Sequence, residues 1–197
     1  MRALLWTLLA LAPACASHRN FAPRENCNGQ GPGRQPAAVY PVQADGAAGE
    51  VRVWSAGSSR RDGAGPEGTE VHLGFEIENT GSQPLRLDLE SLRCDELRAG
   101  DEVLGPLPAA RVEGNPEAAP GTTGRVDAWF LPGPGIAPRD VDSFAARFVV
   151  RCADQAVCNQ VTPFQPYSPD SHYRHDPWLW GGFGFGIGWW GSRRPWR

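Results

Sequence analysis

Lysine is absent from this sequence: all 19 basic residues are arginine, against 22 acidic residues and a formal net charge of −3. No segment is strongly basic, so the composition does not favour a nucleic-acid partner. We interpret the exclusive use of arginine as the codon usage of a GC-rich genome. The charge pattern therefore indicates no class of partner by itself.

Catalytic motifs are also lacking. The chain has no Gly-x-Ser-x-Gly nucleophile motif, no glycine-rich phosphate loop and no Cys-x-x-Cys pair. Its four histidines are His18, His72, His172 and His175. His72 alone falls within the predicted strands, between Glu70 and Glu76 on a face that we expect to be solvated. Neighbouring carboxylates (Asp88 with Glu90, Asp101 with Glu102) are typical of soluble strands and turns. We expect no enzyme and no cofactor.

The N-terminal apolar run is too short to span a membrane. It follows Arg2 and covers residues 3–12, which as a helix rise about 15 Å, roughly half of a bilayer's hydrocarbon core. The small residues Ala14, Cys15, Ala16 and Ser17 come next. One positive residue, a short apolar run and a small-residue site predict a secretory signal over residues 1–14.

Two cleavage sites are compatible with this signal. Ala12-Pro13-Ala14 fits the small-x-small rule of an ordinary signal peptidase. Leu11-Ala12-Pro13-Ala14-Cys15 resembles the lipobox of bacterial envelope lipoproteins. That resemblance implies that Cys15 becomes the acylated first residue and holds the protein on a membrane. We expect an exported cell-envelope protein, on the outer membrane and facing the periplasm or the exterior.

The cysteine count favours the lipid. The chain has five cysteines: Cys15, Cys27, Cys94, Cys152 and Cys158. Exported proteins usually pair their thiols, and four remain once Cys15 is set aside. We predict bridges Cys94–Cys152 and Cys27–Cys158. The rival scheme joins Cys152 to Cys158 across a tight hairpin and leaves Cys27 for Cys94.

Composition divides the rest of the chain into three parts. Residues 15–36 carry Gly, Pro, Asn and Arg with hardly any apolar residue, which predicts a flexible, lipid-anchored tether. Residues 37–166 are typical of one folded domain. Residues 167–197 form a tail rich in Gly, Trp and Arg.

Alternating hydrophobicity predicts strands throughout the domain. TEVHLGFEIEN places Val71, Leu73, Phe75 and Ile77 on one face, and LRLDLESL repeats the pattern with Leu85, Leu87 and Leu89. Asn79-Thr80-Gly81-Ser82 between them predicts a hairpin turn. Further strands are predicted in VYPVQA, EVRVWSA, EVLGPL, GRVDAWFL, SFAARFVVRC and VCNQVTPF. About seven to eight strands separated by Gly/Pro loops favour an all-β fold, an antiparallel β-sandwich with a β-barrel as the competing architecture.

The phrase FEIENTGSQPLRLDL is similar to immunoglobulin-like domains of bacterial envelope proteins. The resemblance implies a single immunoglobulin-like sandwich and no particular function. With this fold we expect a non-catalytic binding or structural role. The alternative is a small metal-binding or enzymatic module that uses His172 and His175 of DSHYRHD, whose nitrogen and oxygen ligands suit Zn or Cu.

The tail alternates aromatic residues with glycine in WLWGGFGFGIGWWGSRRPWR. Three interpretations stay open: a strand or flap on its own sandwich, a contact with lipid or an envelope partner, and a low-complexity end. The residues predicted for a membrane or partner contact are Trp178, Trp180, Phe183, Phe185, Trp189, Trp190, Arg193 and Arg194.

Overall fold

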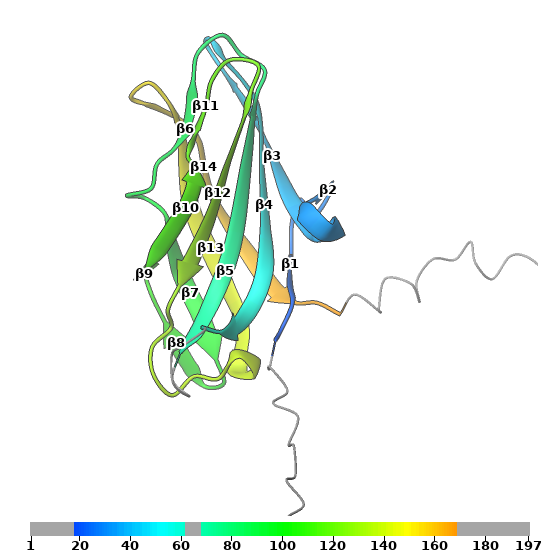
Figure 1. The fold of residues 1–197 in the computed structure, drawn as a ribbon, viewed down its shortest axis with the longest axis vertical. Coiled ribbons are helices and arrows are strands. Elements are labelled where there is room, and N and C mark those ends of the chain that lie inside the picture. The colour runs from blue at the N-terminus through cyan, green and yellow to red at the C-terminus, as the bar shows by residue number, and fades with distance from the viewer. Residues whose placement is uncertain (1–17, 62–67, 169–197) are drawn as a thin grey trace, which may run out of the picture. The chain divides into compact units, whose positions relative to one another are not determined.

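The computed structural model describes residues 18–61 and 68–168, which form an antiparallel β-sandwich without an α-helix (Figure 1). In this part of the chain one sheet has six strands, in the order β10-β12-β5-β4-β3-β2, and the other has eight. Five strands of the second sheet follow the order β1-β14-β13-β6-β11, while β7 pairs with β13, β8 and β9. The prediction of an all-β sandwich is confirmed, with more and shorter strands than expected.

The strands of the six-stranded sheet are β2 (Gly29–Gln30), β3 (Pro36–Ala44), β4 (Ala47–Arg60), β5 (Thr69–Asn79), β10 (Arg111–Asn115) and β12 (Thr123–Phe130). Those of the eight-stranded sheet are β1 (Phe21–Pro23), β6 (Leu85–Leu87), β7 (Arg93–Ala99), β8 (Glu102–Leu104), β9 (Leu107–Pro108), β11 (Glu117–Ala118), β13 (Val141–Cys152) and β14 (Gln155–Pro166). Two 3₁₀ turns, η1 (Pro32–Arg34) and η2 (Pro138–Asp140), complete the described elements.

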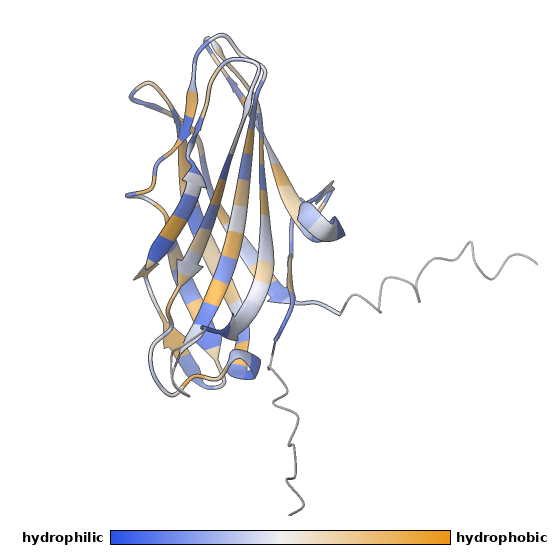
Figure 2. Ribbon diagram, in the orientation of Figure 1, coloured by the Kyte–Doolittle hydropathy of each residue, from blue (hydrophilic) through white to orange (hydrophobic). Residues whose placement is uncertain are grey.

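The core lies between the sheets, because successive side chains of a strand point to opposite faces. Figure 2 shows the resulting alternation of hydrophobic and hydrophilic residues along the long strands. Phe148 of β13 packs edge-on against Phe75 of β5 at 5.5 Å and against Tyr40 of β3 at 5.7 Å between ring centroids. The Tyr40 hydroxyl is hydrogen-bonded to the hydroxyl of Thr162 in β14 at 2.8 Å. These contacts join the two sheets.

The predicted hairpin after β5 is wrong. β5 belongs to the six-stranded sheet and β6 to the eight-stranded one, so the Asn-Thr-Gly segment carries the chain from one sheet to the other. The Asn79 side-chain amide donates to the carbonyls of Gln83 and Ala118 at 2.8 Å each, which fixes this crossover. Leu89, predicted as core, is 38% exposed because β6 stops at Leu87 and a turn follows.

The predicted flexible tether over residues 15–36 is wrong for its described part, residues 18–36. β1 pairs with β14 in the register Phe21↔Pro166 to Pro23↔Phe164, and the Arg24 N–H donates to the Pro163 carbonyl. The Phe21 ring is 1% exposed and meets Phe144 at 5.0 Å. The buried Phe21 ring and the backbone bonds to β14 together dock this polar segment on the sheet edge. We call residues 18–24 the N-terminal strap.

The strap connects both sheets. Besides its pairing with β14, it forms an antiparallel bridge between Arg19 and Ser58 of β4, with N–O distances of 3.1 and 2.9 Å. The Asn20 carbonyl accepts the N–H of Tyr167 at 2.9 Å. The first and last described parts of the domain therefore lie side by side.

Candidate functional site

The most organised polar surface is the outer face of the six-stranded sheet. Val126, Ala128 and Phe130 of β12 are buried, so the intervening Trp129 points outward. Trp129 lies opposite His72 of β5 in the register, and the two rings stack at 4.4 Å with an interplanar angle of 11°. Half-burial of both side chains against each other gives this face a rigid aromatic pair.

Charged groups enclose that pair. The Arg111 guanidinium of the edge strand β10 lies 3.8 Å from the centroid of the Trp129 ring, a cation–π contact. His72 Nε2 is 3.0 Å from Asp127 Oδ1, and Asp127 is also 3.4 Å from the Arg125 guanidinium. A carboxylate beside an imidazole fixes the ring and would pair with it when the imidazole is protonated.

A second tryptophan lies on the same face but is buried. Trp54 of β4 is 2% exposed because its ring lies over Gly74 of β5 and beneath the chain at Gly31. A Cβ at Gly31 would stand 2.7 Å from the indole, and one at Gly74 would overlap it. The Arg125 guanidinium lies 5.4 Å from the indole centroid. Glycine at these two places is what allows the backbone to approach the ring.

Next to Trp54, Arg52 forms ion pairs with three carboxylates. Arg52 contacts Glu76 at 2.6 Å and Glu78 at 3.1 Å, and it also pairs with Glu50. Partial burial by itself lowers the pKa of Arg52, but hydrogen bonds to Glu76 and Glu50 outweigh it, so the pKa lies above its ordinary value. The whole outer face carries six carboxylates and three guanidinium groups: Glu50, Glu70, Glu76, Glu78, Glu113 and Asp127 against Arg52, Arg111 and Arg125.

The outer face combines a stacked aromatic pair with several ion pairs. His72 contacts the Asp127 carboxylate and the Trp129 indole. The polar side chains largely neutralise one another in pairs along the strands. The arrangement presents an aromatic pair framed by excess negative charge, which suits contact with a polar or cationic surface.

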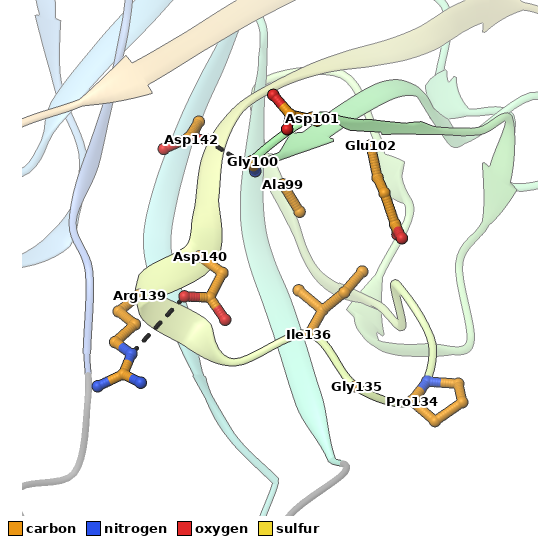
Figure 3. Close-up of a pocket in the computed structure, with 10 residues that line it drawn as sticks. All are labelled: Ala99, Gly100, Asp101, Glu102, Pro134, Gly135, Ile136, Arg139, Asp140 and Asp142. Atoms are coloured by element: carbon orange, nitrogen blue, oxygen red, sulfur yellow. Dashed lines mark hydrogen bonds and ion pairs between the residues drawn. The ribbon is translucent and has the colours of Figure 1, made fainter.

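A cavity of about 650 Å³ lies at the end of the sandwich where the strap begins (Figure 3). The turn between β7 and β8 forms one wall, and the chain from Pro134 to η2 forms another. Asp142 accepts the N–H of Gly100 at 2.9 Å, and Asp140 accepts the N–H of Ala137 at 3.1 Å. These two carboxylates therefore brace the turns that line the cavity. We call this region the strap end of the sandwich.

Arg19 joins the strap to this end. Its guanidinium donates to the carbonyls of Arg139 at 2.7 Å and Val141 at 2.8 Å, and it lies 3.2 Å from Asp142. The Ser58 hydroxyl, beside Arg19, donates to the Pro138 carbonyl at 2.8 Å. Arg19 thus ties the first residues of the domain to η2 and the start of β13.

The predicted bridge between Cys94 and Cys152 is wrong. Cys94 of β7 lies opposite Ala146 of β13, and Cys152 is the last residue of β13. Six residues of strand separate them, about 20 Å, whereas bridged Cα atoms lie within about 7 Å. Both residues are free thiols, and burial raises the pKa of Cys94 to about 12, which keeps that thiol protonated.

The predicted bridge between Cys27 and Cys158 is wrong as well. Cys27 is exposed, whereas Cys158 is 6% exposed within the core, where burial raises its pKa to about 11. In the rival scheme, Cys158 lies opposite Val150, two residues from Cys152, so these two share one end of the β13–β14 pair. In the structure they too are free thiols, and of the other pair Cys27 is exposed whereas Cys94 is buried.

The other predicted site residues lie outside the described residues. These are the lipidation site Cys15, the metal candidates His172 and His175, and the contact residues Trp178, Trp180, Phe183, Phe185, Trp189, Trp190, Arg193 and Arg194. Within residues 18–61 and 68–168, no three His, Cys, Asp or Glu side chains are grouped to hold a metal ion. The same ranges contain no helix of the length and apolarity needed to cross a bilayer.

Sequence reasoning missed Trp129 and Arg111 as a pair. The signal for Trp129 was present, since GRVDAWFL alternates and its tryptophan falls on the outward face. Arg111 had no such signal, because β10 is a five-residue edge strand with few apolar residues. Its position depends on a pairing with β12 that is known only from the fold.

Comparison with known proteins returns no relative: no family model, curated protein or solved structure matches this chain. The proposals below therefore rest on its own residues and contacts.

Proposed function

We propose that this protein is an exported envelope lipoprotein, anchored through Cys15, whose β-sandwich has a non-catalytic binding or structural role. The observation that carries the proposal is the position of the lipobox-like segment relative to the fold. The described domain begins at His18, three residues after Cys15, and from Arg19 onward every part of the strap is bonded to the sandwich. A leader cleaved at Cys15 would leave the whole sandwich intact.

A binding role is supported by the outer face of the six-stranded sheet. Arg111 lies over the Trp129 ring and Asp127 bonds to His72, so the stacked pair is held from both sides. Preorganised polar and aromatic groups on a rigid sheet are typical of a recognition surface.

The tail has a place in the same proposal. The chain leaves the sandwich next to the strap, because the Tyr167 N–H bonds to the Asn20 carbonyl. The last residues of the sandwich and the strap therefore lie side by side. Tryptophan favours the headgroup zone of a bilayer and arginine meets anionic lipid, so we propose that the tail contacts the membrane or an envelope partner.

Lipidation is tested by mass spectrometry of the protein extracted from membranes. We expect an acylated N-terminal cysteine, and we expect Cys15→Ser to move the protein into the soluble fraction, because each buried CH₂ of an acyl chain contributes about 0.8 kcal/mol to partitioning. Cys27→Ser is the matched control: it also removes an exposed thiol and should leave the protein on the membrane. A mature chain that starts at Cys15 or Ser17 without lipid would refute the proposal.

A further inference from the structure

We propose that the strap end of the sandwich lies against the bilayer surface, with the loop of residues 131–138 as its main contact. This inference rests on the proposed lipid at Cys15 and adds an orientation to it. A tethered domain would sample all orientations, but the structure replaces the expected tether with a docked strap.

The short segment between Cys15 and His18, which we call the linker, limits how far the domain can lie from an acyl chain on Cys15. Cys15 and His18 are three residues apart, and three extended residues span at most about 11 Å. Arg19 is already fixed to Ser58, Arg139 and Val141. An acyl chain inserted at Cys15 would therefore keep His18 within about 11 Å, and Arg19 within about 14 Å, of the anchored residue.

The loop that begins beside the strap is suited to such a surface. Residues 131–138, LPGPGIAP, contain no charged group. The loop ends at Pro138, whose carbonyl accepts the Ser58 hydroxyl, and Thr69 donates to the carbonyl of Ile136. The Leu131 side chain is 36% exposed, and Val103 of β8 is 59% exposed near the same end. These are two of the four large hydrophobic residues that the described chain exposes.

Within residues 18–61 and 68–168, the charged groups at the strap end are of both signs: Arg19, Arg60, Arg61 and Arg139 with Asp101, Glu102, Asp140 and Asp142. On the outer face of the six-stranded sheet, carboxylates outnumber guanidinium groups, so that face is less suited to anionic headgroups.

The test compares a fluorescent label at two leucines of equal exposure. Leu131 is 36% exposed at the strap end and Leu89 is 38% exposed elsewhere. Asp88, next to Leu89, bonds to Val149, and Val149 lies eight residues along β13 from Val141, about 26 Å. Leu131→Cys and Leu89→Cys, each in a Cys27→Ser background, would carry an environment-sensitive dye. The full lipidated chain would be placed in vesicles of phosphatidylethanolamine and phosphatidylglycerol that contain headgroup-nitroxide lipid.

We expect the label at Leu131 to shift to shorter wavelength and to be quenched by the nitroxide, and the label at Leu89 to do neither. Equal quenching at both positions on membrane-bound protein would overturn the orientation and leave lipidation standing. Protein that fails to bind the vesicles would instead refute the proposed function. If a leucine variant does not fold, Val103→Cys against Val161→Cys gives a second pair, at 59% and 40% exposure.

Lengthening the linker tests whether its shortness causes the proposed orientation. Twenty Gly/Ser residues inserted between Ser17 and His18 would extend the reach to an r.m.s. distance of about 25 Å. We expect the quenching at Leu131 to fall while vesicle binding is retained, because the lipid is unchanged. Undiminished quenching would show that the short linker does not set the orientation, and the argument from linker length would be wrong.

Discussion

At the turn after β6, the ion pair of Asp88 and Arg151 determines how the stability of the protein should change with pH. Asp88 accepts a hydrogen bond from Arg151 of β13 at 2.8 Å and caps the turn by accepting the Glu90 N–H at 3.2 Å. The Arg151 hydrogen bond lowers the pKa of Asp88 below its ordinary value, against the opposing effect of partial burial. Asp88→Asn removes the charge and keeps the size of the side chain.

The exposure of these two side chains sets the expected size of the stability loss. The Asp88 side chain is 15% exposed and that of Arg151 is 35% exposed, so the pair is partly screened by water. A hydrogen bond to a charged group contributes about 1.5–3 kcal/mol when it is shielded and an exposed ion pair contributes less than about 1 kcal/mol. We therefore expect Asp88→Asn to lower the free energy of unfolding by about 1–2 kcal/mol at pH 7.

The pH dependence provides the decisive measurement. A carboxyl whose pKa is lower in the folded than in the unfolded state contributes stability above the unfolded pKa, about 3.9, and loses it as the pH falls through the folded pKa. Urea unfolding from pH 7 down to pH 2 should show the wild-type advantage at high pH and its loss at low pH. Asp154→Asn, an exposed carboxylate nearby, is the matched control and should change little. A difference from wild type that persists unchanged at pH 2, or one that Asp154→Asn reproduces, would refute the reasoning.

Three further variants test the packing described above. Gly74→Ala should lower the free energy of unfolding by about 1–3 kcal/mol because the added methyl group overlaps the Trp54 ring, and Gly74→Ala with Trp54→Leu should recover part of the loss; calorimetry measures both. Arg52→Gln should cost about 1–2 kcal/mol at neutral pH because Glu50 and Glu78 face each other across the strands without their shared partner, with a smaller loss in acid; urea titration at two pH values tests this. Phe21→Ala should cost about 3 kcal/mol and expose the strap to proteolysis, and an unchanged cleavage pattern would show that the strap is held by its backbone bonds alone.

The long strands could be predicted because their pattern is local. β5 alternates over eleven residues, and its inward residues Val71, Leu73, Phe75 and Ile77 are at most 1% exposed. Around β6, the alternation of LRLDLESL predicts a strand that reaches Leu89, whereas β6 ends at Leu87. Asp88 starts a turn by capping Glu90, so Leu89 turns outward and Leu92, at 2% exposure, fills the core instead. Alternation alone cannot mark the residue at which a strand ends.

The short edge elements could not be predicted because their stability comes from partners distant in sequence. β11 has two residues and pairs with β6, while β1 has three and pairs with β14, more than 140 residues away. Residues 18–36 are polar, and this composition predicts a flexible tether. Composition alone does not show that β14, far away in the sequence, offers an open strand edge with which β1 can pair. The outer-face site has the same limit. Trp129 and His72 were readable as outward residues, but their stacking needs the register of β12 on β5.

The strap links the stability of the fold to the geometry of anchoring. Phe21 closes the side of the sandwich at Phe144, and Arg19 fixes the chain to the carbonyls of Arg139 and Val141. These contacts dock residues that the sequence predicted as a tether, so that only Ala16 and Ser17 lie between Cys15 and the first described residue, His18. If the strap came loose up to Arg24, nine residues would be free and their reach would rise to about 30 Å. If Cys15 carries the proposed lipid, a domain that keeps its strap docked would stay close to the bilayer, and loss of strap packing would release the proposed orientation without releasing the protein from the membrane.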